Sequence, residues 1–190
     1  MSAHQSDSAV GLPFSAARAS ERAPSAVEEE VIQLFDQFRD RLLRYALSFG
    51  LSPEDGEEII QEVFLSLFQH IQRRKPRHNL QGWMFRVAHN LALKRREANR
   101  KAARNAGESS EALSARFDSA NPEEQAIHFQ RQQRLRAVLR ALPEQDQYCL
   151  HLRAEGLVYR EIAEVLRISP AAVSVSLGRS LARLSRADGG

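Results

Sequence analysis

The chain has 190 residues, 43% of them hydrophobic and 27% charged, which suits either one folded domain or two small ones. It contains no apolar run of the roughly 20 residues that a membrane-spanning helix requires, so an integral membrane protein is excluded and no membrane insertion is predicted. The single cysteine, Cys149, allows no intramolecular disulfide and is compatible with a reducing cytoplasm.

The formal net charge is only +3, but the charges are unevenly distributed. Between Val31 and His70, seven acidic residues outnumber three arginines, which gives a net charge of −4. Between Ile71 and Arg104, eleven basic residues stand against one glutamate, which gives +10. Neighbouring segments of opposite charge predict two different partners.

The N-terminal part begins with a tail and a first helix. Residues 1–26 lack the basic start and apolar core of a secretion signal and are rich in serine and alanine, which predicts a disordered tail. Apolar residues then recur at spacings of three and four from Val31 to Phe49, which predicts a helix that ends near Gly50. Ser52 and Pro53 have the chemistry of the next helix start, a capping side chain followed by proline.

The second predicted helix has an apolar stripe from Ile59 to Ile71 and an acidic face. The residues expected to point toward solvent are Glu57, Glu58, Gln61 and Glu62. Pro76 interrupts the following stretch, RRKPRHNLQ, which is predicted to be a basic loop. A third helix is then expected to place Trp83, Val87 and Leu91 in the core and to end in the basic cluster KRREANRK.

Periodicity is lost over residues 102–122, which predicts a flexible linker. Further helices are expected beyond it: one with a stripe that ends before Pro143, a short one around Tyr148 and Leu152 that is closed by Gly156, and a final pair. No strand pattern is found. The predicted fold class is therefore all-α, with small helical domains at 27–101 and 123–187 joined by the linker.

The segment YREIAEVLRISPAAVSVSLGRSLARL has the pattern of a helix-turn-helix motif. Ala163 supplies the small residue of the first helix, Arg167 to Ser169 the turn, and Val173 and Leu177 the apolar anchors of the second helix. Ser169 is predicted to cap that second helix. An ordinary helical hairpin is the alternative interpretation.

Two parts of the chain resemble one family. LRALPEQDQYCLHLRAEGLVYREIAEVLRISPAAVSVSLGRSLARL is similar to region four of the extracytoplasmic-function (ECF) sigma factors of bacterial RNA polymerase. EEIIQEVFLSLFQHI and LQGWMFRVAHNLALKRR are similar to region two, and the resemblance covers roughly Val31 to Arg186. It implies a cytoplasmic alternative sigma factor that binds core RNA polymerase and directs transcription initiation from specific promoters.

The resemblance implies a role for each charged segment of region two. The second helix would dock on the polymerase clamp through Glu57, Glu58, Gln61 and Glu62. The basic loop and third helix would read and open the minus-ten element of promoter DNA, with cations on phosphates and Asn79 on an unstacked base. The residues expected to bind DNA there are Arg73, Arg74, Lys75, Arg77, Asn79, Arg86 and Asn90.

The last helix would read the minus-thirty-five element. With Val173, Leu177, Leu181 and Leu184 placed inward, the opposite face has few hydrogen-bonding groups, which predicts recognition by shape and by contact with thymine methyl groups. The residues expected on or beside that face are Ala171, Ala172, Ser174, Val175, Arg179 and Arg183.

Some positions depart from the family pattern. Lys94 stands where an acid is usual, and Arg167 stands where glycine is usual in the turn. If that turn needs a left-handed backbone, Arg167 costs on the order of 1 kcal/mol. Ser174 and Ser176 stand where the family often has lysine or arginine, so weaker binding to phosphates is expected.

No enzyme activity, cofactor or metal site is predicted, because the histidines are scattered without ligand spacing and no glycine-rich phosphate loop is present. Two other classes of function stay open: a helix-turn-helix regulator whose first domain binds a protein, and a partner-binding protein that has lost DNA binding. An anti-sigma factor is a further candidate partner.

Overall fold

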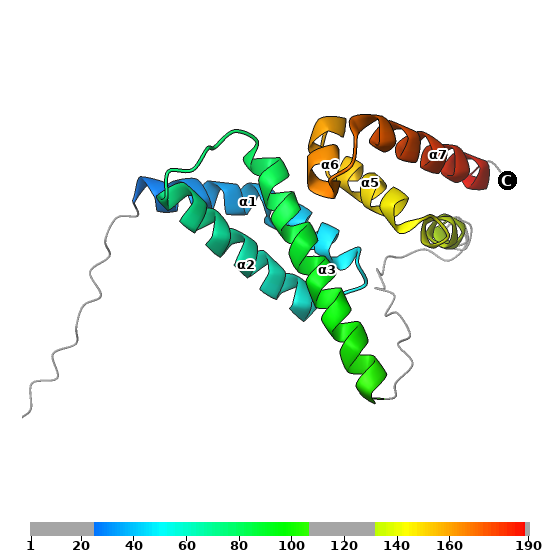
Figure 1. The fold of residues 1–190 in the computed structure, drawn as a ribbon, viewed down its shortest axis with the longest axis horizontal. Coiled ribbons are helices and arrows are strands. Elements are labelled where there is room, and N and C mark those ends of the chain that lie inside the picture. The colour runs from blue at the N-terminus through cyan, green and yellow to red at the C-terminus, as the bar shows by residue number, and fades with distance from the viewer. Residues whose placement is uncertain (1–24, 107–131, 189–190) are drawn as a thin grey trace, which may run out of the picture.

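The structure, a computed structural model, describes residues 25–106 and 132–188, and every regular element in these ranges is a helix (Figure 1). The N-terminal helical group consists of α1 (Ala26–Leu47), α2 (Pro53–Gln72) and α3 (Leu80–Ala106). The C-terminal helical group consists of helical residues 132–140, α5 (Glu144–Ala154), α6 (Tyr159–Leu166) and α7 (Pro170–Asp188). For the described residues, the prediction of an all-α fold with two helical groups is confirmed.

The ends of the N-terminal helical group differ from the prediction. The hydroxyl of Ser25 accepts a hydrogen bond from the Glu28 N–H at 3.3 Å, and the Ser25 N–H donates to the Glu28 carboxylate at 2.6 Å. This capping box starts α1 just inside the expected tail. At the other end α3 continues to Ala106, so residues 102–106 of the expected linker are helical. The remainder of the expected tail, the remainder of the linker and residues 123–131 lie outside the described residues.

The start of α2 confirms its prediction. Pro53 is the first residue of the helix, and the Ser52 hydroxyl accepts a hydrogen bond from the Asp55 N–H at 3.1 Å. The predicted apolar stripe from Ile59 to Ile71 is buried, except that Phe68 is half-buried. The apolar stripe is therefore the face of α2 that packs against α1 and α3.

The prediction for the core face of α3 is confirmed only in part, because the three predicted side chains pack against the core but at its edge. Trp83, Val87 and Leu91 are only half-buried. The fully buried hydrophobic side chains of α3 are those of Met84, Phe85, Ala88 and Ala92. The reason is that α3 packs against α1 and α2 and also against α6 of the other group, so its buried face is wider than a single amphipathic stripe.

The helix-turn-helix motif is present as predicted. Ala163, Val173 and Leu177 are buried, and the Ser169 hydroxyl accepts a hydrogen bond from the Ala172 N–H at 3.1 Å at the start of α7. Arg167 ends α6 in the left-handed conformation, with φ 56° and ψ 43°. The non-glycine residue therefore carries the cost of order 1 kcal/mol expected for that conformation.

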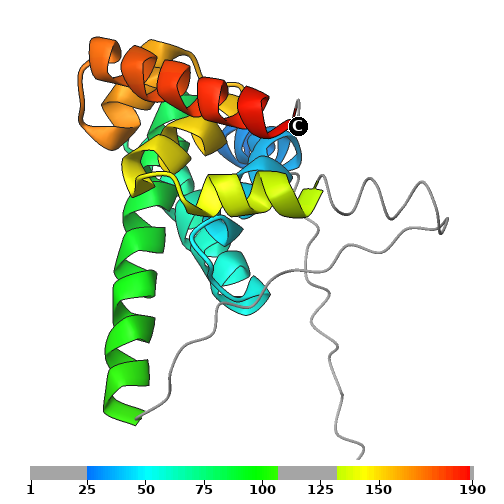
Figure 2. The same cartoon turned by 90° about the vertical axis from the view of Figure 1, so that its right-hand side faces the viewer.

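The two helical groups share one hydrophobic core. The rings of Phe49 and Tyr148 stack across the boundary with centroids 4.8 Å apart, and His89 meets the edge of Tyr148 at 5.1 Å. His89 Nδ1 is hydrogen-bonded to the Tyr45 hydroxyl at 2.8 Å. Burial lowers the pKa of His89 to about 4, so its imidazole is neutral at neutral pH. Figures 1 and 2 show the C-terminal helical group against the first half of α3, whose other half projects away from both groups.

Candidate nucleic-acid interface

The acidic face of α2 is divided into paired and unpaired residues. Glu57 forms an ion pair with Arg39 of α1 at 2.5 Å, and Glu58 forms one with Arg95 of α3. Gln61 and Glu62 are exposed and make no hydrogen bond or ion pair with another described residue. Among the predicted polymerase-binding residues, these last two are the ones whose polar groups are available to a partner.

The basic loop between α2 and α3 displays three exposed cations. Arg73, Arg74 and Lys75 have no ion-pair partner within the described ranges. The backbone turns sharply here, since Arg74 has a φ of 51° and Asn79 a φ of 55°. The loop therefore presents a dense positive charge at the end of α2.

Two contacts hold this loop in place. His70 Nε2 is hydrogen-bonded to the carbonyl oxygen of Pro76 at 2.9 Å. Arg77, which was predicted to bind DNA, forms an ion pair with Glu30 of α1 at 2.7 Å. Arg77 is half-exposed, but its charge is already partly neutralised within the protein.

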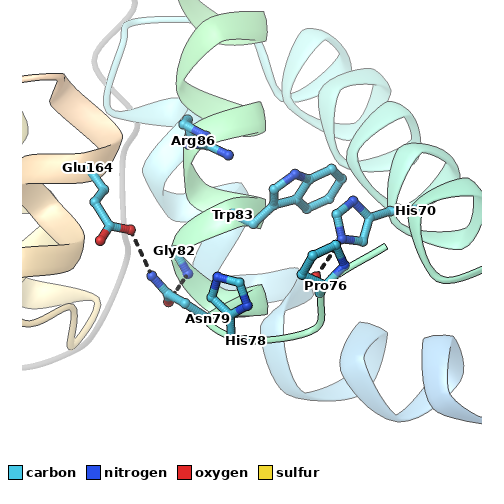
Figure 3. A pocket seen from close by; sticks show the side chains of 8 residues that line it. All are labelled: His70, Pro76, His78, Asn79, Gly82, Trp83, Arg86 and Glu164. Atoms are coloured by element: carbon cyan, nitrogen blue, oxygen red, sulfur yellow. Dashed lines mark hydrogen bonds between the residues drawn. The ribbon is translucent and has the colours of Figure 1, made fainter. Parts of the chain in front are cut away.

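A cavity of about 290 Å³ lies beside the loop. Figure 3 shows that its walls come from the end of α2, the loop, the start of α3 and, on the opposite side, α6. The ring of Trp83 lies 4.7 Å from that of His70. The lining residues are His70, Pro76, His78, Asn79, Gly82, Trp83, Arg86 and Glu164.

Asn79 occupies a central position in this cavity. Its side-chain oxygen accepts a hydrogen bond from the Gly82 N–H at 3.0 Å, and its side-chain nitrogen donates to the Glu164 carboxylate at 3.2 Å. A Cβ atom at position 82 would lie only 2.6 Å from that nitrogen. Glycine at 82 therefore leaves the space in which the Asn79 amide folds back onto α3.

Arg86 and Asn90, which are both predicted to bind DNA, are exposed on α3. Arg86 lines the cavity, whereas Asn90 does not. The structure thus brings Asn79 and Arg86 together at one opening, with the three loop cations on the adjoining loop.

The predicted orientation of α7 is partly wrong. Leu181, expected to be buried, is 54% exposed, while Ser176 and Ser180 are buried. Ser176 stands where the family often has lysine or arginine, but because it is buried it is not available to a phosphate. The inward face passes through these small serines because α5 and α6 approach α7 closely. Of the predicted reading residues, Ala171, Ser174, Val175, Arg179 and Arg183 are exposed, and Ala172 is half-buried.

Arg179 makes a bidentate contact inside the C-terminal helical group. Its guanidinium donates to both carboxylate oxygens of Asp146, at 2.9 Å and 2.7 Å. The Asp146 side chain is only 1% exposed, and that of Arg179 is 48% exposed. The hydrogen bonds from Arg179 lower the pKa of Asp146 against the opposing effect of burial. Arg179 thus joins α7 to α5 whether or not it also meets DNA.

Residues that the sequence prediction missed include Gly82 and Glu164. Glycine at 82 carries no side chain that would have marked it as part of a site. Glu164 lies on the first helix of the motif, on a face that helical period predicts to be exposed. No local pattern in the sequence connects it to Asn79.

No metal-binding group of three or more His, Cys, Asp or Glu side chains occurs in the part of the chain that the structure describes. None of the described helices is both long enough and apolar enough to cross a membrane.

Two family models match this chain. Residues 34–102 match Sigma-70 region 2, and residues 132–184 match Sigma-70, region 4. The ECF RNA polymerase sigma factor ShbA of Streptomyces griseus subsp. griseus is 33% identical over 150 residues, which cover 75% of this chain and 78% of that protein. The ECF RNA polymerase sigma factor SigE of Mycolicibacterium smegmatis is 31% identical over 163 residues. That match covers 81% of this chain but only 57% of the SigE relative.

Solved structures share the fold. CnrH in complex with the cytosolic domain of CnrY matches with a TM-score of 0.58 and 22% identity, over 83% of this chain and 86% of that chain. The sigma factor RpoE in complex with the anti-sigma factor NepR, from Bartonella quintana, matches with a TM-score of 0.59 and 17% identity, over 84% and 96% of the two chains.

Proposed function

Since the chain belongs to the extracytoplasmic-function sigma factors of RNA polymerase, we propose that it binds core RNA polymerase in the cytoplasm and directs transcription initiation from specific promoters. In this proposal residues 27–101 engage polymerase and the minus-ten element, and residues 123–187 engage the minus-thirty-five element. The chain acts as a regulator and not as an enzyme.

The observation that carries this proposal is the position of three unpaired cations beside a cavity. Arg73, Arg74 and Lys75 are suited to the phosphates of a DNA strand, because they are exposed and make no ion pair with another described residue. Asn79 and Arg86, at the cavity, offer hydrogen-bond donors to the edge of an unstacked base. This combination suits a single strand more than an intact duplex.

The exposed face of α2 and the exposed face of α7 have separate roles in the proposal. Gln61 and Glu62 contact polymerase, because their polar groups are not used within the described protein. On α7, the exposed Ala171 and Val175 meet thymine methyl groups in the major groove. Ser174 and Arg183 lie beside them and contact phosphates or base edges.

The experiment that tests the function is transcription in vitro. The purified chain is added to core RNA polymerase with promoter-containing DNA from its own source, and transcript ends are mapped. A defined start that depends on the chain supports the proposal. If only random starts are found while the chain still binds duplex DNA upstream of genes, a helix-turn-helix regulator is the better description.

The loop cations are expected to set the salt dependence of promoter binding. Replacing Arg73 and Arg74 by alanine should lower the slope of log affinity against log salt by about 0.7–0.9 for each phosphate that the variant no longer neutralises. Arg77→Ala should change the slope less, because its ion pair with Glu30 already neutralises part of its charge. The slopes are measured with the polymerase complex by filter binding, and equal slopes for the double variant and the wild type would contradict the assignment.

An anti-sigma factor is a further proposed partner. The two solved structures of similar fold support this part of the proposal, because RpoE is bound there to the anti-sigma factor NepR and CnrH to the cytosolic domain of CnrY. Capture of a co-encoded protein by the full chain, with loss of transcription when that protein is added, tests this part of the proposal.

A further inference from the structure

The first half of α7, the helix assigned to the minus-thirty-five element, carries no charge. Residues 170–178 contain no acidic or basic side chain. Arg179, the first cation of the helix, is bound to both carboxylate oxygens of Asp146. The part of α7 that enters a groove first therefore brings no free cation to the phosphates on either side of it.

A free cation lies instead in the turn that leads into this helix. Arg167 is exposed and forms no ion pair with another described residue. The carboxylate of Glu161 accepts a hydrogen bond from the Val158 N–H at 2.9 Å. The carboxylate of Glu164 lies 3.5 Å from the guanidinium of Arg160. Both acids that precede the turn on α6 thus contact other groups, and the Arg167 guanidinium is available to a ligand.

The backbone of the turn holds the Arg167 side chain toward solvent. The Ile168 N–H donates to the Ala163 carbonyl oxygen at 3.1 Å, a bond that accompanies the left-handed conformation of Arg167 at the end of α6. Leu166 and Ile168, on either side, are half-buried and pack against the core. Arg167 is therefore held in a fixed position between two anchored neighbours.

An arginine in this conformation is unfavourable for the fold alone. With a φ of 56°, its Cβ is crowded against the backbone, whereas glycine adopts the same conformation freely. Glycine is also the residue that is usual in this turn of the family. A strained residue that is exposed and unpaired contributes little to packing, which indicates a role in binding.

We propose that Arg167 binds a phosphate of the minus-thirty-five element and replaces the cations that the first half of α7 lacks. This inference rests on the proposed function. In a helix-turn-helix the second helix enters the major groove and the first crosses the DNA backbone, so the turn between them passes close to the phosphates. Arginine suits this role because its guanidinium can donate two parallel hydrogen bonds to one phosphate. Such a contact positions the protein on the duplex without reading the sequence.

The test uses Arg167→Gly in the full-length chain. Glycine removes the cation and relieves the left-handed backbone in one step. The melting temperature of the chain should therefore stay the same or rise, by up to about 4 °C, while binding to promoter DNA becomes weaker. A side chain that served only the fold would lower the melting temperature and leave DNA binding unchanged.

DNA binding is measured by filter binding of the complex with core RNA polymerase at several salt concentrations. The probe is the promoter fragment whose start is mapped in the transcription experiment. We expect the slope of log affinity against log salt to fall by about 0.9, which corresponds to about eightfold weaker binding at 0.1 M salt. A second fragment, cut just downstream of the minus-thirty-five element, should bind the variant and the wild type equally.

Three further variants test whether the charge itself is responsible. Arg167→Lys keeps the cation and should keep the slope of the wild type. Arg136→Ala is the matched control, because it removes an exposed cation from helical residues 132–140, outside the motif. It should leave the slope unchanged. Arg167→Gly/Ser174→Arg returns a cation to the exposed face of α7 and should restore most of the lost slope.

The inference is wrong if Arg167→Gly keeps the wild-type slope on the full fragment, loses as much on the shortened fragment, or melts at a lower temperature. Failure of Ser174→Arg to restore the slope would refute the replacement of α7 cations by Arg167. Any of these results together with a defined transcript from the wild-type chain would overturn the inference alone. Absence of a defined transcript would overturn the proposed function and this inference with it.

Discussion

Replacing Glu62 by lysine is expected to weaken binding to core RNA polymerase about tenfold or more, which corresponds to about 1.4 kcal/mol. The side chain is exposed on α2 and makes no hydrogen bond or ion pair with another described residue, so its charge is available to a basic partner. Reversing one charge of a close pair removes an attraction and adds a repulsion. The effect should therefore appear in binding and not in folding.

The measurement is a titration of labelled chain with core polymerase, together with a thermal melt. Glu97→Lys is the matched control, because it makes the same change of charge at an exposed position of α3 whose pairing with Lys101 is a surface contact. We expect less than about a twofold effect from this control. Equal affinities of the Glu62→Lys variant and the wild type would mean that this face of α2 does not contact polymerase.

Glu57 and Glu58 are expected to behave differently from Glu62. Their ion pairs with Arg39 and Arg95 join α2 to its neighbours, so reversing either charge also weakens packing within the N-terminal helical group. Loss of polymerase binding in such a variant could come from a lost contact with polymerase or from weakened packing of α2, and the measurement would not separate the two. The structure therefore narrows the polymerase test to Gln61 and Glu62.

Separating Arg179 from Asp146 is expected to destabilise the C-terminal helical group. Asp146→Asn removes the charge of a buried carboxylate that accepts two hydrogen bonds, which should cost about 1–3 kcal/mol in the free energy of unfolding. Arg179→Ala should be at least as harmful, because it leaves that carboxylate buried without its ion-pair partner. Arg183→Ala, on the same helix and without an ion-pair partner among the described residues, is the control.

The pH dependence of stability provides an independent check of this pair. The folded-state pKa of Asp146 is lowered, so the stabilisation is complete above the ordinary aspartate pKa of about 3.9 and is lost as the pH falls through the lowered value. Melting temperatures measured between about pH 2 and pH 7 should fall less steeply at the acid end for Asp146→Asn than for the wild type. Parallel curves would show that the pair contributes no pH-dependent stability.

The same variants separate a folding role of Arg179 from DNA reading. If Arg179 acts through the fold, Asp146→Asn and Arg179→Ala should both weaken binding to minus-thirty-five DNA, and the double variant should be little worse than either. If Arg179 bonds a base directly, Arg179→Ala alone should cost DNA affinity at an unchanged melting temperature. Footprinting with the full chain and polymerase measures the affinity in each case.

The helix-turn-helix could be predicted residue by residue because its signals are local. The Ser169 cap, the position of Pro170 and the burial of Val173 and Leu177 depend on contacts within a few residues and on one neighbouring helix. The phase of the rest of α7 was not predictable in this way. Leucine at 181 looked like a core residue, but the buried face of α7 passes through Ser176 and Ser180, and the leucine is exposed.

The sequence predicted the cations of the candidate DNA surface but not the contacts that give the surface its shape. The run from Arg73 to Arg77 showed that a basic loop follows α2, because proline excludes a continuing helix. It did not show that Glu30 pairs with Arg77 or that glycine at 82 admits the Asn79 amide, since both depend on how the loop meets α1 and α3.

By itself the sequence determined the helices, the caps at Ser52 and Ser169 and the two charged segments, because each of these depends on side chains that lie within about four residues of one another. Only the tertiary structure decided which charges remain free. Arg44 and Glu155 are 111 residues apart, and Asn79 and Glu164 are 85 apart, so no periodicity relates them. Such pairs form only where the packing of the two helical groups brings distant surfaces together, and that packing, in which α3 contacts α6, is a property of the whole fold.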